Sequence, residues 1–384
     1  MNEKLKILFI TTSFPRYKDD PLAAGTFILE LAKNINNLGH HVTVLAPGVT
    51  GIPDRYEIDG VNIVRIKYAP EKYQKLTNNP GGIPVLIKNK SPVLAFFPSL
   101  FFNFFRVTGK TAKDYDIIHA HWLFNAFSPV LSKPLHRKKV VVSIRGSDII
   151  NKKIVLLYSK FLKFTDGIIS VNEEGLKNFD NLNIAKAHIP NGVYINKIKI
   201  SDKPIVIATS GYFIKRKNLK ILAEALKIVN DKGFDFKAFF IGDGEEKNEI
   251  KEIVKDFKNK IVFTGFVPQK DVIGFLDKSH IFVLPSLFEG RSNSLLEAMA
   301  NGKAVIVSDI PQNREIVIDN ENGLIFATTS AIDLAEKLIL LIQKRELVTN
   351  FGENAQKTII KMGLTWENSA KKHVEFYKQI INSK

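Results

Sequence analysis

Short apolar runs recur along the first half of the chain, and turn residues separate them from segments of helical periodicity. Such runs are typical of strands, and the clearest helical segment, 26–38, ends at Gly39. Continuously apolar strands that alternate with helices indicate a parallel sheet covered on both faces. The strands expected in this half are 6–13, 41–47, 62–66, 116–122, 139–146 and 167–172.

The same alternation restarts after a polar segment at 191–203, so we expect two doubly wound α/β halves joined near residue 200. In such folds ligands bind at the carboxyl ends of the strands, and two facing halves create a cleft there. A last amphipathic helix, 366–381, places Trp366, Ala370, Val374 and Tyr377 on one face. The strands expected in the second half are 204–210, 236–241, 260–266, 281–285, 304–309 and 323–326, with helices at 218–230, 245–257 and 294–300.

The length of 384 residues exceeds one ordinary core, which also favours two domains, 1–200 and 201–365. The chain has no cysteine, so disulfides, thiolate metal sites and iron–sulfur clusters are excluded. The apolar run at 7–10 is too short for a secretory signal, and we expect a cytoplasmic protein. The net charge of +16 would suit nucleic acid, an anionic membrane face or phosphorylated small molecules.

The most apolar stretch, 93–107, is interrupted by polar residues and is too short to span a bilayer. Its phenylalanines lie beside Arg106 and Lys110, which suits a helix at an anionic membrane surface, such as the inner face of the cell membrane. The same pattern suits a helix that covers the sheet, and the sequence leaves both interpretations open. The phenylalanines are Phe96, Phe97, Phe101, Phe102, Phe104 and Phe105.

The strongest chemical pattern follows the strand expected at 281–285, where seven residues separate Glu289 from Glu297. Glu289 is expected on the loop at the carboxyl end of the strand, and Ser292 or Asn293 is expected to cap the helix that carries Glu297. Free amides at a helix start favour an anion, usually phosphate. Carboxylates on either side of a phosphate site suit a nucleotide sugar, which has hydroxyl groups at both ends.

This region resembles the motif of two glutamates, with seven residues between them, of family 4 retaining glycosyltransferases with the GT-B fold. The segment 286–309 follows the family almost position by position and is similar to enzymes that build exopolysaccharides and teichuronic acid. The resemblance implies that Glu297 binds the ribose hydroxyls, while Glu289 lies by the transferred sugar and stabilises the transition state. It also implies that the donor diphosphate meets the helix start at Asn293, Ser294 and Leu295.

A basic segment follows the first strand of the second half. Lys217 lies six residues after Gly211, where the family has a lysine that binds the diphosphate. A cation at a helix start is unfavourable unless an anion binds there. Many members have an arginine directly after the glycine, but here it is Tyr212. Either Arg216 supplies the second cation or that charge is missing.

The first half carries the weaker matches. Gly25 precedes the first helix and is similar to the family's glycine loop, where a backbone approaches the ligand closely. His119 and His121 lie two apart and therefore face the same side of a strand. No carboxylate or cysteine cluster joins them in the sequence, so no metal is expected. The resemblance favours His121 as the histidine that points into the cleft.

Two further segments resemble parts of the family's donor site. The segment 143–148 is similar to its His-Gly-Ser-Asp motif, with Arg145 in the place of the histidine and Asp148 retained. Many members use that histidine to touch the donor sugar, and some polysaccharide-building members have arginine there. Phe266 and Val267 follow a strand end whose backbone reads the nucleotide base in the family.

Taken as a whole, the resemblance implies a GT-B fold of two Rossmann-like domains that face across a cleft. The first would bind the acceptor, the second the nucleotide sugar, and the final helix, 366–384, would cross back to the first. The implied activity is the retaining transfer, without metal or other cofactor, of a hexose-type sugar from a UDP- or GDP-linked donor to a saccharide or lipid-linked acceptor, in cell-surface polysaccharide or glycolipid synthesis. The alternatives are another GT-B sugar-nucleotide enzyme, an epimerase or a phosphorylase, and a basic nucleic-acid-binding protein.

Overall fold

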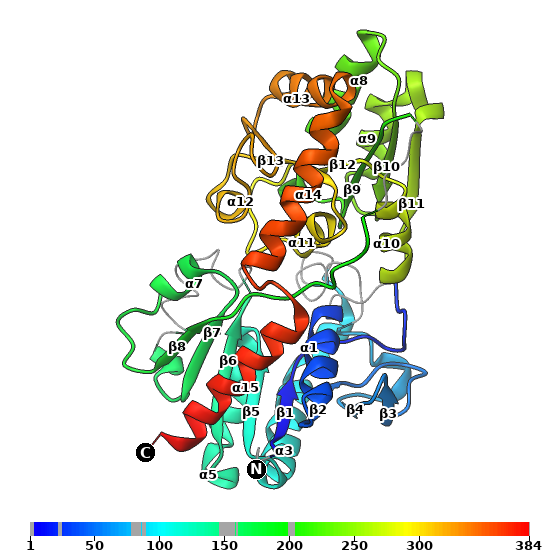
Figure 1. Ribbon diagram of the computed structural model, residues 1–384. Helices are drawn as coiled ribbons and strands as arrows, with labels where there is room; N and C mark the ends of the chain where they lie inside the picture. The colour runs from blue at the N-terminus through cyan, green and yellow to red at the C-terminus, as the bar shows by residue number, and fades with distance from the viewer. Residues whose placement is uncertain are drawn as a thin grey trace. The chain divides into compact units, whose positions relative to one another are not determined.

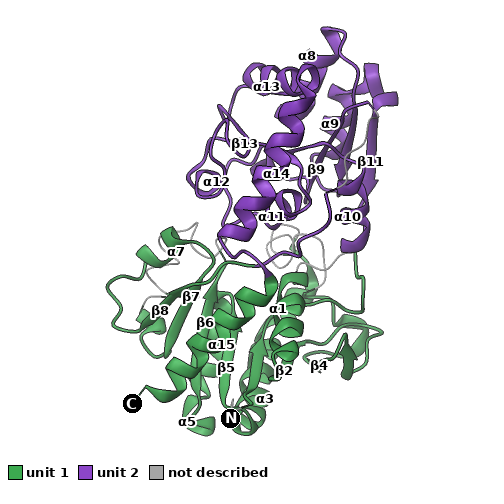
Figure 2. Cartoon of the chain, viewed as in Figure 1, with its two compact units in different colours: residues 1–191, 366–384 green, residues 192–365 purple. Residues whose placement is uncertain are grey.

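The computed structural model describes residues 4–21, 25–77, 86, 90–145, 158, 160–198 and 204–383. The chain divides into two compact units, the first formed by Met1–Asn191 with Trp366–Lys384 and the second by Gly192–Thr365 (Figure 2). The division lies before Gly192, whereas the sequence analysis placed it near residue 200. Each unit is built around its own sheet (Figure 1).

The sheet of the first unit has eight strands in the order β3-β4-β2-β1-β5-β6-β7-β8. All of its pairs except β3–β4 are parallel, which confirms the predicted βα alternation. The strands are β1 (Lys6–Ile10), β2 (His41–Pro47), β3 (Arg55–Ile58), β4 (Val61–Ile66), β5 (Ile117–His121), β6 (Lys139–Ile144), β7 (Gly167–Ser170) and β8 (Ala185–His188).

The edge of this sheet departs from the prediction, because β3 pairs with β4 in the antiparallel direction. Asp59 and Gly60 connect the two strands and have positive φ angles of 49° and 80°. Two such residues form the tight hairpin turn that Asp-Gly sequences favour. The expected parallel sheet therefore has an antiparallel pair at this edge.

The two faces of the sheet bury alternate residues of each strand. In β1, Ile7 and Phe9 pack with α1 (Thr26–Asn37) and α15 (Trp366–Asn382), while Leu8 and Ile10 face α3 (Phe97–Thr111). This alternation follows from the two-residue period of a strand. Among the described residues, this unit also has helices α4 (Phe127–Leu131), α5 (Lys133–His136) and α7 (Glu173–Lys177), with 3₁₀ turns η1 (Glu71–Tyr73), η2 (Pro92–Phe96), η3 (Ala112–Asp114) and η4 (Leu123–Ala126).

Helix α15 belongs to the first unit although it follows the whole of the second unit in the sequence. Its predicted apolar face is confirmed, because Trp366, Ala370, Val374 and Tyr377 are all buried against the core that contains α1. Burying one large apolar side chain contributes about 1.5–3 kcal/mol, so this face explains why the helix docks there.

The phenylalanine-rich stretch forms α3 and mostly covers the sheet. Phe104 is buried, and the rings of Phe97 and Phe101 lie 5.5 and 6.4 Å from those of Phe124 and Phe127. Phe102, in contrast, is 61% exposed. Most of the phenylalanine side chains that were candidates for membrane contact therefore pack within the first unit. Across the described ranges, no helix combines the length and apolarity needed to cross a membrane.

The second unit contains a six-stranded parallel sheet in the order β11-β10-β9-β12-β13-β14. Its strands are β9 (Val206–Ser210), β10 (Lys237–Ile241), β11 (Ile261–Gly265), β12 (Ile281–Leu284), β13 (Ala304–Ser308) and β14 (Leu324–Phe326), as predicted to within three residues. The helices and turns are η6 (Lys215–Lys217), α8 (Leu219–Asp231), α9 (Lys247–Ile253), η7 (Lys255–Lys260), α10 (Gln269–Asp277), α11 (Asn293–Ala300), α12 (Pro311–Arg314), α13 (Ala331–Gln343) and α14 (Arg345–Lys361).

Candidate active site

Glu289 lies on the loop that follows β12 and is only 5% exposed. Its Oε1 atom accepts hydrogen bonds from Lys217 Nζ and Ser286 Oγ, both at 2.6 Å. Arg216 Nη1 lies 3.4 Å from the other carboxylate oxygen, Oε2. The structure therefore gathers three predicted site residues, from the loops after β9 and β12, at the carboxyl ends of adjacent strands. Ser286 was missed by the sequence analysis.

The carboxylate of Glu289 is held in its charged form by these neighbours. Burial by itself would raise its pKa, but Lys217, Ser286 and Arg216 more than offset that penalty and lower the pKa below its ordinary value. The buried negative charge is thus satisfied by one short ion pair and one hydroxyl group. Such a group can stabilise positive charge that develops on a bound sugar without reorganising.

Backbone contacts fix the position of the two cations. The carbonyl oxygen of Arg216 accepts a hydrogen bond from the Leu287 amide at 2.9 Å, and Arg216 Nη1 donates to the Phe288 carbonyl at 3.1 Å. The side chain of Lys217 passes Gly211, whose φ of +145° suits glycine, and a Cβ there would lie 3.5 Å from Lys217 Cε. The two loops are consequently tied together beside Glu289.

Helix α11 begins as predicted, with Ser292 as its N-cap, because the Ser292 hydroxyl accepts from the Leu295 amide. One turn further on, Glu297 Oε1 accepts a hydrogen bond from Gln269 Nε2 of α10 at 2.7 Å. Burial raises the pKa of Glu297 to about 7, and the bond from Gln269 only partly opposes this shift. The two glutamates of the motif therefore differ in protonation near neutral pH. No local pattern links Gln269 to Glu297, so the sequence analysis missed it.

Tyr212, which stands where many family members have arginine, stacks on Phe266. The two rings are nearly parallel, at 14°, and their centroids lie 5.8 Å apart. Tyr212 follows β9 and Phe266 follows β11, so both rings are at the carboxyl ends of strands in the same sheet as Glu289. Val267 packs beside the buried core of this unit. Part-exposed, parallel aromatic rings are suited to stacking against a nucleobase.

In the first unit, His119 and His121 face the same side of β5, as predicted, with ring centroids 4.1 Å apart. His119 lies between two hydroxyl groups, those of Tyr377 and Ser143, each 2.6 Å from a ring nitrogen. Burial, together with nearby His373 and Arg145, lowers the pKa of His119 well below the ordinary range. The His pair is therefore neutral and is tied to α15 through Tyr377, a contact that the sequence did not indicate.

Arg145 links His121 to Asn191. Its Nη2 atom donates to His121 Nδ1 at 3.0 Å, Nη1 donates to Asn191 Oδ1 at 2.6 Å, and the guanidinium lies 4.7 Å from the centre of the Phe27 ring. Burial is the main cause that lowers the pKa of His121 well below its usual value. Since Nδ1 accepts from arginine, the neutral ring carries its proton on Nε2, which is buried and has no partner in the described chain. His121 thus presents a hydrogen-bond donor.

Gly25 is required by a close backbone approach at the start of α1. A Cβ at this position would lie 2.2 Å from the carbonyl oxygen of Ser13. The other predicted residue of this half, Asp148, lies outside the described residues. Within the described parts of the chain, the structure places no group of three or more His, Asp or Glu side chains that could hold a metal ion.

Two family models match the chain, and together they extend over most of it. The family described as "Glycosyltransferase Family 4" matches residues 24–197, and the family described as "Glycosyl transferases group 1" matches residues 192–358. The second match contains Lys217, Glu289 and Glu297.

Individual proteins agree with these matches. An uncharacterised glycosyltransferase of Methanocaldococcus jannaschii is 30% identical over 66% of this chain and 72% of its own length. The N,N'-diacetylbacillosaminyl-diphospho-undecaprenol alpha-1,3-N-acetylgalactosaminyltransferase of Campylobacter jejuni is 25% identical over 78% of this chain and 83% of its own. Among solved structures, Anabaena HepE in complex with UDP and glucose superposes with a TM-score of 0.72 at 17% identity, covering 98% of this chain and 100% of that one.

Proposed function

Since this chain belongs to the family 4 glycosyltransferases and has the GT-B fold, we propose that it transfers a hexose-type sugar from a nucleotide diphosphate sugar to a hydroxyl group of a saccharide or lipid-linked glycan. The observation that carries this proposal is the cluster of Glu289 with Lys217 and Arg216. A buried carboxylate beside two cations suits a substrate in which a sugar that gains positive charge is bonded to an anionic leaving group. We place the activity in the synthesis of cell-surface polysaccharide or glycolipid.

The donor is proposed to bind along the carboxyl edge of the second unit's sheet. Lys217 and Arg216 would bind the diphosphate together with the start of α11 at Asn293, Ser294 and Leu295. Glu297 would accept hydrogen bonds from the ribose hydroxyl groups, and the base would stack near Phe266 and Val267. HepE, whose structure contains UDP and glucose, supports a UDP-linked donor, and a GDP-linked donor remains the alternative.

The reaction is proposed to proceed with retention and without a metal ion. The acceptor oxygen forms its bond to the anomeric carbon on the face from which the diphosphate departs, while the bond from that carbon to the phosphate oxygen breaks. The acceptor proton passes to the departing phosphate oxygen. Lys217 and Arg216 stabilise the negative charge of the leaving group, and Glu289 stabilises the positive charge on the sugar.

The first unit is proposed to bind the acceptor and to supply further contacts to the donor sugar. His121 would offer its Nε2–H group, while Arg145, Asp148 and Gly25 would complete this side of the site. The relative from Campylobacter jejuni has a diphospho-undecaprenol compound in its name, which supports a lipid-linked acceptor. We therefore propose that the protein works in the cytoplasm at the inner face of the cell membrane.

Nucleotide binding and product stereochemistry test this proposal directly. The cognate nucleotide diphosphate at a hundred times its Kd is expected to stabilise the protein by about 2.7 kcal/mol, seen as a higher melting temperature in a screen of UDP, GDP and ADP. With the matching sugar nucleotide, proton NMR of the first-formed product should show the anomeric configuration of the donor. An inverted product would overturn the mechanism, and no response to any nucleotide would overturn the function.

Glu297 should make nucleotide binding depend on pH. Because its pKa is about 7, the ionised fraction, and with it the affinity for ribose hydroxyls, is expected to rise about tenfold between roughly pH 6 and 8. The Glu297→Gln variant should bind more weakly and show no such dependence, whereas Glu336→Gln on α13 should behave as wild type. Calorimetric titration at each pH would measure this, and a flat wild-type profile would contradict it.

The same group affects stability with a defined sign. The folded-state pKa lies above the ordinary value of 4.5, so the group stabilises the fold most below that pH and loses this contribution as the pH rises through about 7. Melting temperatures without nucleotide, taken at each pH, therefore separate this effect from the effect on binding.

A further inference from the structure

The segment formed by α4 and α5 has polar side chains on its inner face. Ser128, Ser132 and His136 are spaced four residues apart, so they lie on one side of the segment, and all three are buried. The Ser128 hydroxyl donates to Thr108 Oγ1 at 2.9 Å, the Ser132 hydroxyl donates to the Ser128 carbonyl at 2.8 Å, and His136 Nε2 lies 2.9 Å from the Pro129 carbonyl. The inner face is therefore satisfied by polar contacts within the segment and with α3.

The outer face of the same segment carries leucines. Leu131 and Leu135 are also four residues apart, and their exposed fractions are 48% and 54%. The adjoining Phe164 is 56% exposed, and its carbonyl oxygen accepts a hydrogen bond from Lys133 Nζ of α5 at 3.1 Å. The same segment also buries Pro129 and Val130, and Leu135 lies against Gly109 of α3, so the exposed parts of the leucines form one edge of a packed segment. Neighbouring exposed apolar residues of this kind mark a surface that meets something less polar than water.

The part of the sequence that contains these apolar side chains is rich in lysine and arginine. Residues 90–166 contain thirteen Lys and Arg against four Asp, which accounts for nine of the sixteen net positive charges of the chain. Arg137, Lys160 and Lys163 are exposed and form no ion pair among the described residues. Helix α3, which contacts α5, adds an exposed stripe at Phe102, Arg106 and Lys110.

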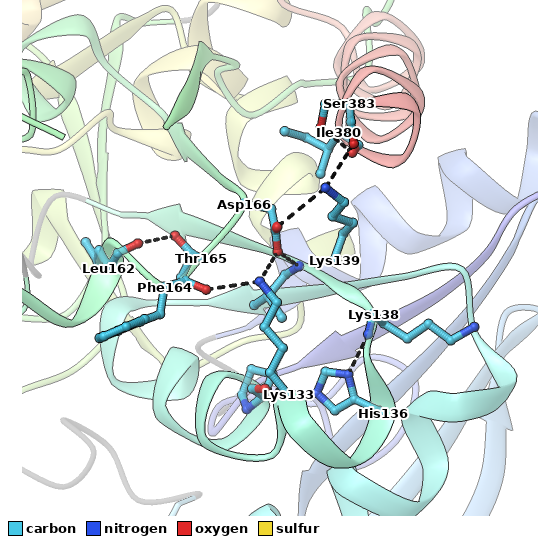
Figure 3. Close-up of polar contacts among 12 residues, drawn as sticks. Lys133, His136, Lys138, Lys139, Leu162, Phe164, Thr165, Asp166, Ile380 and Ser383 are labelled. Carbon is cyan, nitrogen blue, oxygen red and sulfur yellow. Dashed lines mark hydrogen bonds and ion pairs between the residues drawn. The ribbon is translucent and has the colours of Figure 1, made fainter. Parts of the chain in front are cut away.

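Lys133 and Lys139 belong to a structural cluster and do not add to the free charge. Asp166 lies 2.6 Å from Lys133 Nζ and 3.8 Å from Lys139 Nζ, and it also accepts from the Val140 amide (Figure 3). Lys139 Nζ donates in addition to the Ser383 carbonyl at 3.0 Å. These contacts hold α5 against the starts of β6 and β7. They give the apolar face a rigid support, while the side chain of Lys138 extends away from the cluster (Figure 3).

We propose that the outer face of α4 and α5, with Leu131, Leu135 and Phe164, docks on an anionic phospholipid bilayer. Apolar side chains next to lysines suit binding to the surface of an anionic bilayer. The apolar side chains can insert between the lipid headgroups while the lysine ammonium groups stay level with the phosphates. Each cation near the surface adds about 1 kcal/mol of attraction to anionic lipid. The inference deepens the proposed function, since the surface would bring the enzyme to a lipid-linked acceptor, but binding to lipid requires no catalysis.

Flotation with vesicles of phosphatidylglycerol and phosphatidylcholine tests the proposal on the full chain. Wild-type protein is expected to float with mixed vesicles at low salt, to bind vesicles of pure phosphatidylcholine much less, and to be largely released by 0.5 M NaCl. The Leu131→Gln/Leu135→Gln double variant should lose at least about tenfold in affinity for the mixed vesicles, because two apolar contacts are removed. Lys160→Glu/Lys163→Glu should lose a similar factor.

Matched changes in the second unit serve as controls. Ile332→Gln/Ile360→Gln removes two apolar side chains that are 64% and 54% exposed, at least as exposed as the leucines. Lys232→Glu/Lys258→Glu makes the same change of charge as the lysine variant, and both controls should bind vesicles as wild type does. Wild-type-like binding by the leucine variant would overturn the proposal. So would salt-sensitive binding to duplex DNA that needs the lysines while vesicle binding does not. Transfer to a water-soluble acceptor should be unchanged in all four variants, so a failure of the docking surface is distinguishable from a failure of the proposed function.

Discussion

Replacing Glu289 with glutamine is expected to lower kcat at least about a hundredfold while the protein remains folded. Glutamine has the same shape, and its carbonyl oxygen can still accept from Lys217 Nζ and Ser286 Oγ, which both lie 2.6 Å from Glu289 Oε1. The change removes the negative charge at the proposed sugar position and little else. Initial rates of sugar transfer at saturating donor, together with the melting temperature, measure the effect.

Glu246→Gln is the matched control for this prediction. Glu246 is also buried, at 7% exposure, and its Oε1 lies 3.3 Å from Lys220 Nζ in the same unit. Its replacement makes the same change of charge in a similar ion pair and should leave kcat within about twofold of wild type. If both variants lose activity equally, or if Glu289→Gln turns over as wild type does, Glu289 has no role at the reacting sugar.

Replacing Lys217 with alanine is expected to lower kcat by at least about a hundredfold as well, for two reasons. The variant loses the cation proposed to stabilise the departing diphosphate. It also loses the strongest of the contacts that lower the pKa of Glu289, so burial should raise that pKa. A carboxylate with a raised pKa is protonated at higher pH, and the acidic limb of the activity profile should therefore move to higher pH.

The pH profile of kcat separates these two effects, because loss of the diphosphate contact alone would lower the rate equally at every pH. Lys220→Ala, which removes a lysine paired with Glu246 and Glu249, is the control and should keep wild-type activity. Wild-type turnover in folded Lys217→Ala would contradict the role of this lysine. An unmoved acidic limb would contradict its effect on Glu289.

Helices and strands could be predicted from the sequence where a local pattern of apolar and polar residues marks them. The strand β2, for example, was predicted with its observed bounds, His41–Pro47, because a buried strand of a parallel sheet is mostly apolar, as Val42, Val44, Leu45 and Ala46 are. The antiparallel strand β3 was missed because it is short and half polar. Asp59 and Gly60 would have indicated its hairpin, since this pair suits the left-handed turn that joins β3 to β4.

In the candidate site, too, the residues with a local sequence signal were predicted and their distant partners were not. Glu289, Glu297 and Lys217 stand out in the sequence because they lie in long segments of distinctive pattern. Their partners do not, because Gln269 is 28 residues from Glu297 and meets it only through the packing of α10 near α11. Arg145 was predicted as a site residue from its motif. Its contact with His121 could not be predicted, because it depends on the pairing of β5 with β6.

By itself, the sequence determined two α/β units, the order of their strands along the chain and the residues proposed to carry the chemistry. These features depend on periodicity and on motifs within about thirty residues. Only the tertiary structure decided the direction in which each pKa moves, lowered for Glu289 and raised to about 7 for Glu297, because pKa values depend on burial and on neighbours distant in the chain. It also decided that Leu131 and Leu135 face outward while Ser132 faces inward, since exposure is a property of packing and no local pattern contains it.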